Sequence, residues 1–447
     1  MIGITITITI TIMKGDGGVE APNTILRGFL AVVSSVKTMV LKIADEYRPP
    51  VVSNTEGNSN LVVVREYCEE RDKVSVEKME TQCDVGQKGK PSIFTDLLGD
   101  PICRIRQFPL HVMLVAEYGE ARDIVGVIRG CIKHVTTGHS HHVLKLAYIL
   151  GLRVSSTHRR LGVGTKLVQH LEEWCKQKGA DYAYIATECA NQPSINLFTQ
   201  KFSYTKFRSP TVLVQPVHAH YKPIGSGITI VRVPPHVAVK VYHHLFANSE
   251  FFSMDIDAIL SNKLNLGTFM AVPKKLLPKW DPETGILPQS FAVLSVWNTK
   301  EVFKLQVKGM SKLTYACCMG SRLLDSWLPW LRLPSFPDVF SQFGVYFLYG
   351  LSMGGTNGPR LMKSLCTFVH NMAKDDVGCG AVVTEVGQQD PVRVAIPHWR
   401  RLSWNEDLWC IKKLANLQGD ECERSETSDW IKSPPSSSGI FVDPRDI

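Results

Sequence analysis

One short segment combines residue types that can bind a phosphate group. Arg159, Arg160, Gly162 and Gly164 form the pattern R-x-x-G-x-G. The glycines allow the backbone to approach a ligand closely, and the first amides of a following helix are unpaired donors at the positive end of its dipole. Because the segment lies between a predicted strand at 145–154 and a predicted helix, we expect these amides to bind a pyrophosphate.

The helix after this loop has one apolar face and a clear end. Its apolar residues recur at helical spacing, and Gly179 stands where a C-terminal cap belongs. The face consists of Leu167, Val168, Leu171, Trp174 and Cys175. A dinucleotide-binding loop would instead need G-x-G-x-x-G and an acidic residue about 20 positions later. Two glycines in a loop also occur by chance, but the flanking elements favour the phosphate site.

Composition limits the class of protein. The chain has 447 residues, enough for two or three domains, with 44% hydrophobic and 21% charged residues, which is typical of a folded globular protein. The net charge of +8 is not gathered into a run, so we expect no direct nucleic-acid binding. The 12 cysteines contain no CxxC pair, which favours reduced thiols in an intracellular compartment.

The first sixty residues differ from the rest. Isoleucine and threonine alternate through 2–12, more like translated repetitive DNA than a selected element, and 1–60 reads as a low-complexity extension. Three cations, Arg27, Lys37 and Lys42, interrupt the apolar stretch 25–43. A membrane span is therefore not expected, whereas a transit peptide stays an alternative.

Three nearby histidines raise the question of a metal. His139, His141 and His142 lie close together, but no cysteine or carboxylate beside them would complete a coordination shell. We therefore expect a polar hairpin loop and no metal site.

The order of elements from residue 61 to about 210 predicts a mixed α/β sheet. A β-branched stretch and apolar runs predict strands, and Asp72 and Asn191 are predicted helix caps. The predicted strands are 61–67, 110–117, 124–132, 145–154 and 182–187, the predicted helices start at Asp72, after Gly164 and at Asn191, and a closing segment begins at Tyr204.

These motifs resemble the acetyl-CoA-binding core of the GNAT superfamily of N-acetyltransferases. The resemblance rests on Leu152-x-Val154, the R-x-x-G-x-G loop, Ile185-Ala-Thr, Asn191 and Leu197-Phe198, and it covers about 61–208. The phrases VVVREY, FTDLLGDPICRIR, LFTQKFSY and IFVDPRDI further resemble the plant Hookless-type family across 61–447. That likeness implies a role in hormone-controlled growth and a location in the nucleus or cytoplasm.

The resemblance implies acetyl-CoA as cosubstrate, bound in a V-shaped opening beside the fourth strand, and no metal. It implies as acceptor a protein lysine or N-terminus; a small amine is the alternative, as is a catalytically silent regulatory protein. The oligomeric state stays open. The implied coenzyme-binding residues are Leu152, Arg153, Val154, Arg159, Arg160, Leu161, Gly162, Val163, Gly164, Thr165, Asn191 and Phe198.

The sequence departs from the family pattern at the catalytic positions. Phe198 stands where many GNAT enzymes have a tyrosine that protonates the leaving thiolate, so Tyr204 or a water would replace it. The strand at 145–154 contains no acid that could serve as the usual general base. Glu188 is the predicted base, with His158 and the histidines at 139–142 as further candidates and an exposed structural glutamate as the alternative.

The second half repeats the first half's order of elements. Phe347–Gly350, the glycine-rich loop 354–358, an apolar-faced helix and Val382–Glu385 parallel Tyr148–Gly151, the loop, its helix and Ile185–Glu188. We therefore predict a GNAT domain at 61–210, a linker at 211–226 and a degenerate second copy at 227–447, all preceded by the extension 1–60. An unrelated α+β domain is the alternative.

Overall fold

The computed structural model describes residues 61–82, 92–138, 143–277, 285–308, 312–328, 330, 338, 340–400, 403, 407–414, 431 and 439–447. The predictions on 1–60 and on His139, His141 and His142 fall outside these residues. Within them, no helix is long and apolar enough to cross a bilayer.

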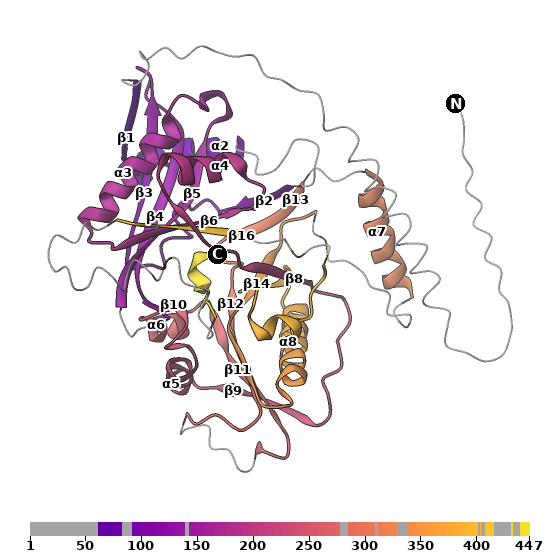
Figure 1. Ribbon diagram of the computed structural model, residues 1–447. Coiled ribbons are helices and arrows are strands. Elements are labelled where there is room, and N and C mark those ends of the chain that lie inside the picture. Colours follow the sequence, from indigo (N-terminus) through magenta and orange to yellow (C-terminus); the bar gives the residue numbers. More distant parts are fainter. Residues whose placement is uncertain are drawn as a thin grey trace, which may run out of the picture. The chain divides into compact units, whose positions relative to one another are not determined.

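The first half forms a mixed sheet with the expected strands (Figure 1). Its strand order is β1-β3-β4-β5-β6-β16-β7, and β10 also pairs with β4. The strands are β1 (Val62–Glu66), β3 (Leu110–Tyr118), β4 (Asp123–Thr137), β5 (Val143–Val154), β6 (Tyr182–Glu188), β7 (Thr205–Arg208), β10 (Glu250–Ser253) and β16 (Asp407–Lys413). The helices of this half are α2 (Glu69–Gln82), α3 (Val163–Gln177) and α4 (Gln192–Asn196), followed by the π-helical turn η3 (Leu197–Lys201).

Helix α3 buries the apolar face that its sequence pattern predicts. Leu167, Val168, Leu171 and Cys175 are buried there against the sheet, in a core with β4, β5 and β6. Gly179 follows the helix with a φ of +76°, a left-handed conformation that favours glycine. The predicted cap is thus confirmed.

The start of α2 differs from the prediction. The helix begins at Glu69, so Asp72 lies inside its first turn and is not the cap. Its buried carboxylate accepts hydrogen bonds from the Cys68 amide at 2.9 Å and from Arg65 at 2.6 Å. Asp72 therefore ties the helix to β1 instead of starting it.

The second half forms a sheet with a matching strand order. Its order is β8-β15-β14-β12-β11-β9. In both sheets, a strand pairs in parallel with the next one along the chain, and a long helix connects the two: β5-α3-β6 in the first, β14-α8-β15 in the second. The elements are β8 (Thr211–Pro216), β9 (Ile228–Val233), α5 (Pro235–Phe246), α6 (Ile256–Ser261), β11 (Asn265–Pro273), β12 (Phe291–Asn298), β14 (Gly344–Gly354), α8 (Gly358–Asp375) and β15 (Cys379–Val386).

This shared order supports the predicted duplication, and the fold is a tandem GNAT-like α/β arrangement. Gly151 in β5 and Gly350 in β14 even share a positive φ, +62° and +59°. The space at both glycines is filled, because a Cβ built on Gly350 would lie 2.2 Å from the Tyr242 hydroxyl and one built on Gly151 would lie 2.9 Å from Arg129 Nη1. The two copies therefore differ in the side chain that fills this space.

Each sheet is completed by a strand from outside its own run of sequence. Strand β8 pairs with β15 of the second sheet, and β16 pairs with β6 and β7 of the first; in Figure 1, the yellow-orange β16 lies among the purple strands of the first sheet. The segment 211–226, predicted as a linker, thus contains a strand of the second sheet. Smaller pieces are β2 (Ser92–Asp96), which pairs with β13 (Lys304–Lys308), and α7 (Lys312–Trp327).

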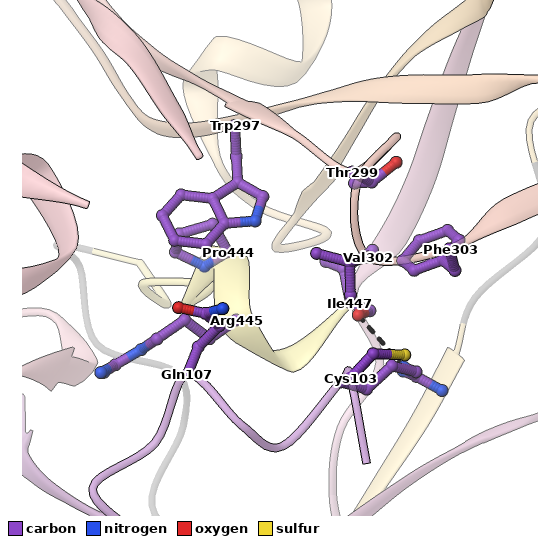
Figure 2. Close-up of a pocket in the computed structure, with 10 residues that line it drawn as sticks. Cys103, Gln107, Trp297, Thr299, Val302, Phe303, Pro444, Arg445 and Ile447 are labelled. Atoms are coloured by element: carbon purple, nitrogen blue, oxygen red, sulfur yellow. Dashed lines mark hydrogen bonds between the residues drawn. The ribbon is translucent and has the colours of Figure 1, made fainter. Parts of the chain in front are cut away.

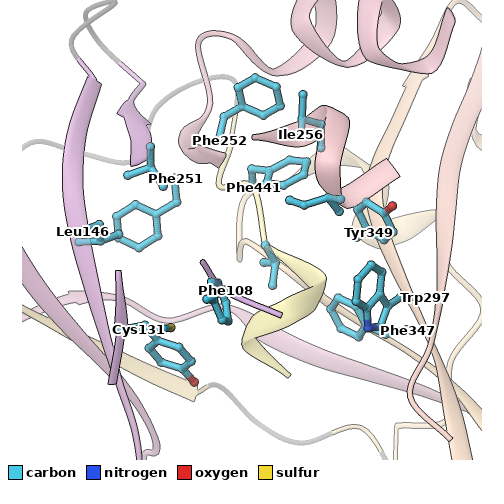
Figure 3. Packing of buried hydrophobic residues seen from close by; sticks show 14 of the residues in the cluster. Phe108, Cys131, Leu146, Phe251, Phe252, Ile256, Trp297, Phe347, Tyr349 and Phe441 are labelled. Carbon is cyan, nitrogen blue, oxygen red and sulfur yellow. The ribbon is translucent and has the colours of Figure 1, made fainter. Parts of the chain in front are cut away.

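One hydrophobic core joins the two halves. Side chains of the first sheet, such as Leu146, and of the second sheet, such as Phe347, belong to the same buried cluster. Figure 3 shows Phe251 and Phe441 in the space between the two groups. Burying one such aromatic side chain contributes about 1.5–3 kcal/mol, so the halves stabilise each other.

Candidate functional site

The R-x-x-G-x-G loop has the geometry of an anion site. It connects β5 to α3 through the 3-10 turn η2 (Ser156–His158), and Gly162 is the N-cap of α3 with a φ of +81°. The first helical hydrogen bond runs from the Lys166 amide to the Gly162 carbonyl, at 3.0 Å. Among the described residues, the amides of Val163, Gly164 and Thr165 have no hydrogen-bond partner. They are therefore free to bind an anion.

The space over this loop is open. A Cβ built on Gly162 would meet nothing within 4 Å. Arg159, Arg160 and Leu161 are exposed, and Arg160 adopts a left-handed φ of +66° that is strained for a residue with a side chain. Backbone strain of this kind is common at functional sites. At this position it adds the positive charge of Arg160 to the segment that contains the free amides. The loop thus offers both hydrogen-bond donors and positive charge.

The strands beside the loop separate as the resemblance implies. Strands β5 and β6 pair from Leu146 with Tyr182 to Ile149 with Ile185, and their pairing ends there. Further along β5, Gly151 and Leu152 together oppose the single residue Ile128 of β4, which is a β-bulge. Past this bulge, the β6-facing backbone edge of β5 is not used in the sheet.

Leu152, Arg153 and Val154 occupy that edge, and all three are half-buried. Arg153 lies 3.6 Å from the Glu80 carboxylate. Their position past the last residue of β5 that pairs with β6 matches the predicted binding place for the pantetheine arm of the coenzyme, an extended chain with amide groups.

Arg129 supports the bulge, a role that the sequence did not suggest. Its buried guanidinium donates to the Pro101 carbonyl at 2.6 Å and to Glu80 at 2.9 Å. A Cβ on Gly151 would lie 2.9 Å from its Nη1. Arg129 thus fills the space under the bulge and fixes the backbone that leads into the coenzyme loop. Nothing in the local pattern of β4 distinguishes this arginine, because its partners lie on other elements.

Asn191 and Phe198 lie on the other side of the opening. Asn191 caps α4 by accepting a hydrogen bond from the Ser194 amide at 3.4 Å, as predicted. Phe198 lies in the π-helical turn, is buried in the α3 core and packs edge-on against Tyr204 with ring centroids 5.2 Å apart. Its phenyl ring thus shapes the wall of the core. A coenzyme contact for either residue stays a prediction.

The structure does not bring Tyr204 to the opening. Its side chain is buried, and its hydroxyl has no hydrogen-bond partner among the described residues. Burial, and next the negative charge of Glu172, raises its pKa well above the ordinary value. Lys412, which lies 5.5 Å from the Tyr204 ring, pairs in the sheet with Ala183, where β5 and β6 are still joined. Tyr204 is therefore placed as a core residue, poorly suited to donate a proton.

Glu188 lies at the end of β6 and has a carboxylate opposite it. It is exposed, and its partner in the adjacent β16 is Asp407. Burial, followed by the charge of Glu188, raises the pKa of Asp407 to about 6. The sequence did not identify Asp407, because it lies more than 200 positions after Glu188. The apolar run Leu408–Ile411 could have predicted the strand, but not its partner.

His158, a further base candidate, lies beside the loop. Its ring packs edge-on against Tyr118 at 4.9 Å, and its Nδ1 is 2.9 Å from the Thr157 hydroxyl. These contacts fix the turn before α3. A structural role for His158 therefore accounts for its surroundings.

Two cavities lie away from this loop. The smaller, about 10 Å³, lies between the halves, and Figure 2 shows residues that line it, including Trp297, Cys103 and Ile447. It has room for about one water. The larger, about 320 Å³, is lined by residues at the start of α5 and the end of α6, among them Arg232 and Asn262.

Comparisons with known proteins agree with this geometry. Residues 81–204 match the family described as "Acetyltransferase (GNAT) family". The chain is 49% identical to "Probable N-acetyltransferase HLS1" of Arabidopsis thaliana, over 87% of this chain and 100% of that protein. It is 40% identical to "Acetyl transferase GW6a" of Oryza sativa subsp. japonica, over 89% and 100%.

Among solved structures, the chain is similar to Saccharomyces cerevisiae N-myristoyltransferase with bound myristoyl-CoA, with a TM-score of 0.49, 9% identity and coverage of 83% and 81%. The plant relatives are much more similar in sequence, since 49% and 40% of the aligned residues are identical along their whole length. The chain therefore belongs to the GNAT acetyltransferase family, whose members use an acyl-CoA cosubstrate.

Proposed function

We propose that this protein transfers the acetyl group of acetyl-CoA to an amine of another protein, a lysine side chain or an N-terminus. The observation that carries the proposal is the set of free amides at Val163, Gly164 and Thr165 beside the separating strands β5 and β6. The amides and Arg160 fit a pyrophosphate, and the part of β5 at 152–154, past its last pair with β6, fits the amide-bearing arm.

Acetyl-CoA supplies an activated thioester carbonyl, which an amine can attack directly. The protein's part is to orient the two reactants and to remove a proton from the ammonium, since only a neutral amine has a free lone pair. The positive loop on one side and the carboxylates Glu188 and Asp407 on the other separate the two tasks. Negative charge at the acceptor side favours a cationic amine.

The acceptor class is tested by following acetyl groups. The purified full chain is incubated with radiolabelled acetyl-CoA and either a plant protein extract, lysine-containing peptides or small amines. Label in proteins at lysines or N-termini, found by mass spectrometry, supports the proposal. Label only in small amines would replace it with a small-amine acetyltransferase.

A silent regulatory protein is the remaining candidate. It is favoured by Phe198, which cannot donate a proton, and by the buried position of Tyr204. Acetyl-CoA binding without release of CoA to any of these acceptors would establish it. We further propose a nuclear or cytoplasmic location and a role in hormone-controlled growth, which a fluorescent fusion expressed in seedlings tests.

A further inference from the structure

A carboxylate of the second sheet reaches the first. Glu385 lies near the end of β15, yet its Oε1 accepts a hydrogen bond from the Trp409 indole at 3.2 Å. Trp409 belongs to β16, which is part of the first sheet. Both side chains are buried, with exposed fractions of 8% and 2%. The two halves are therefore in contact through a buried carboxyl group, that of Glu385.

The strand registers place this contact at the point where the strands of each sheet separate. In the first sheet, parallel pairing ends at Ile185, and Trp409 is opposite the next residue, Ala186. In the second sheet, parallel pairing ends at Thr384, and Glu385 is the next residue. Glu385 therefore lies under β16 at the level where β5 and β6 separate, on the face of the sheet away from α3.

No cation neutralises this acid. Among the described residues, Glu385 forms no ion pair, and its charged neighbours Asp407 and Asp446 are themselves acids. Burial, then the charge of Asp407, raises the pKa of Glu385 to about 8. Asp446 is a second buried acid that lacks a partner on one side. Its Oδ2 accepts hydrogen bonds from Lys133 and Tyr184, whereas its buried Oδ1 has no hydrogen-bond partner among the described residues.

Buried carboxylates without a cation are costly and gather at functional sites. A structural glutamate that only accepts the Trp409 indole could be a neutral glutamine at lower cost. Glu385 lies at the level where the strands separate and on the face opposite α3, and a cationic acceptor beside it there would supply the missing charge.

We propose that Glu385 is the general base of the acetyl transfer, supplied by the second half of the chain to the site of the first. This rests on the proposed function. The Glu385 carboxylate takes one proton from the acceptor ammonium. The freed amine nitrogen forms a bond to the acetyl carbon, the carbon–sulfur bond breaks with its electron pair staying on sulfur, and the second amine proton neutralises the thiolate. Solvent then receives the proton from Glu385.

The first test needs no known acceptor. The Trp409 indole N–H is followed by nuclear magnetic resonance in the full chain with CoA bound, and its signal is assigned by its loss in Trp409→Phe. We expect it to titrate with a midpoint near pH 8 that falls by more than half a unit when n-butylammonium is added, because a cation at Glu385 favours the ionised form. Tetramethylammonium, which cannot donate a proton, controls for ionic strength. A midpoint that butylammonium leaves unchanged overturns the proposal.

The second test uses turnover with whichever acceptor the chain acetylates. Glu385→Gln preserves size and the hydrogen bond from Trp409, so we expect the same folded structure and acetyl-CoA affinity while kcat falls about 10²–10⁴-fold. The remaining rate should rise steadily with pH, as the acceptor loses its proton to solvent. Glu188→Gln tests the rival base. Glu301→Gln, at an exposed glutamate of the second half that pairs with Lys263 at 3.8 Å, is the matched control and should keep the wild-type pH profile.

The results distinguish the proposed function from the assignment of Glu385 as the general base. Wild-type chain that does not bind acetyl-CoA refutes the proposed function, whatever Glu385 does. Normal coenzyme binding with a wild-type rate and pH profile in Glu385→Gln refutes only the general base. A loss confined to Glu188→Gln would move the base to that residue.

Discussion

Replacing Gly162 by leucine separates coenzyme binding from folding. Gly162 has a φ of +81° and a Cβ there would meet nothing within 4 Å. The left-handed backbone costs a side-chain residue about 1–2 kcal/mol, but no neighbour is displaced. In the complex, the new side chain would fill the space over the amides of Val163 and Gly164. Loss of two charge-assisted hydrogen bonds, each about 1.5–3 kcal/mol, predicts an affinity loss of 100-fold or more.

Gly378 is the matched control for this substitution. It too has a left-handed φ, +87°, and open space around its Cβ, but it lies in the turn between α8 and β15 of the second half. Both leucine variants should lose the same 1–2 kcal/mol in urea denaturation. Isothermal titration calorimetry with acetyl-CoA should show normal affinity only for Gly378→Leu. Unchanged affinity in Gly162→Leu would refute the pyrophosphate assignment.

Four further substitutions test individual features. Arg160→Gly relieves a left-handed φ of +66°, so its stability in urea denaturation should equal that of the wild type or exceed it by up to about 1 kcal/mol. Calorimetry should show weaker acetyl-CoA binding. A stability below that of the wild type would argue against strain at Arg160. Lys133→Ala leaves the buried Asp446, 2.5 Å from Lys133 Nζ, without its cation and should cost about 3–5 kcal/mol in the same assay; a loss below 1 kcal/mol would contradict this. Tyr204→Phe removes a hydroxyl without a hydrogen-bond partner and should change kcat less than twofold, whereas a large drop would restore Tyr204 as the general acid. Burial, and next the charge of Asp407, raises the pKa of Glu385 from 4.5 to about 8, so the folded chain holds this proton more tightly than the unfolded chain. The stability that the proton contributes is full below pH 4.5 and is lost as pH rises to 8. Glu385→Gln should therefore gain stability over wild type across that range, by a few kcal/mol at most, and parallel curves of stability against pH for the two proteins would refute it.

Local sequence patterns were sufficient to predict the elements and the coenzyme loop. Apolar runs predicted β5 and β6, the spacing of Leu167, Leu171 and Cys175 predicted α3, and glycine at 162 matched the left-handed N-cap. These signals are local, since backbone conformation and the burial of one face depend on residues a few positions apart. The repeated pattern in the second half was predicted from the same kind of signal.

Only the tertiary structure decided which distant residues meet. The exchange of β8 and β16 between the sheets, and with it the placing of Asp407 beside Glu188 and of Glu385 beside Trp409, depends on contacts across 24 to more than 200 positions. Such pairings are chosen by the packing of whole sheets around a shared core, which no local pattern encodes. For the same reason Tyr204, a suitable acid by residue type, lies in the core, and the proposed base comes from the other half of the chain.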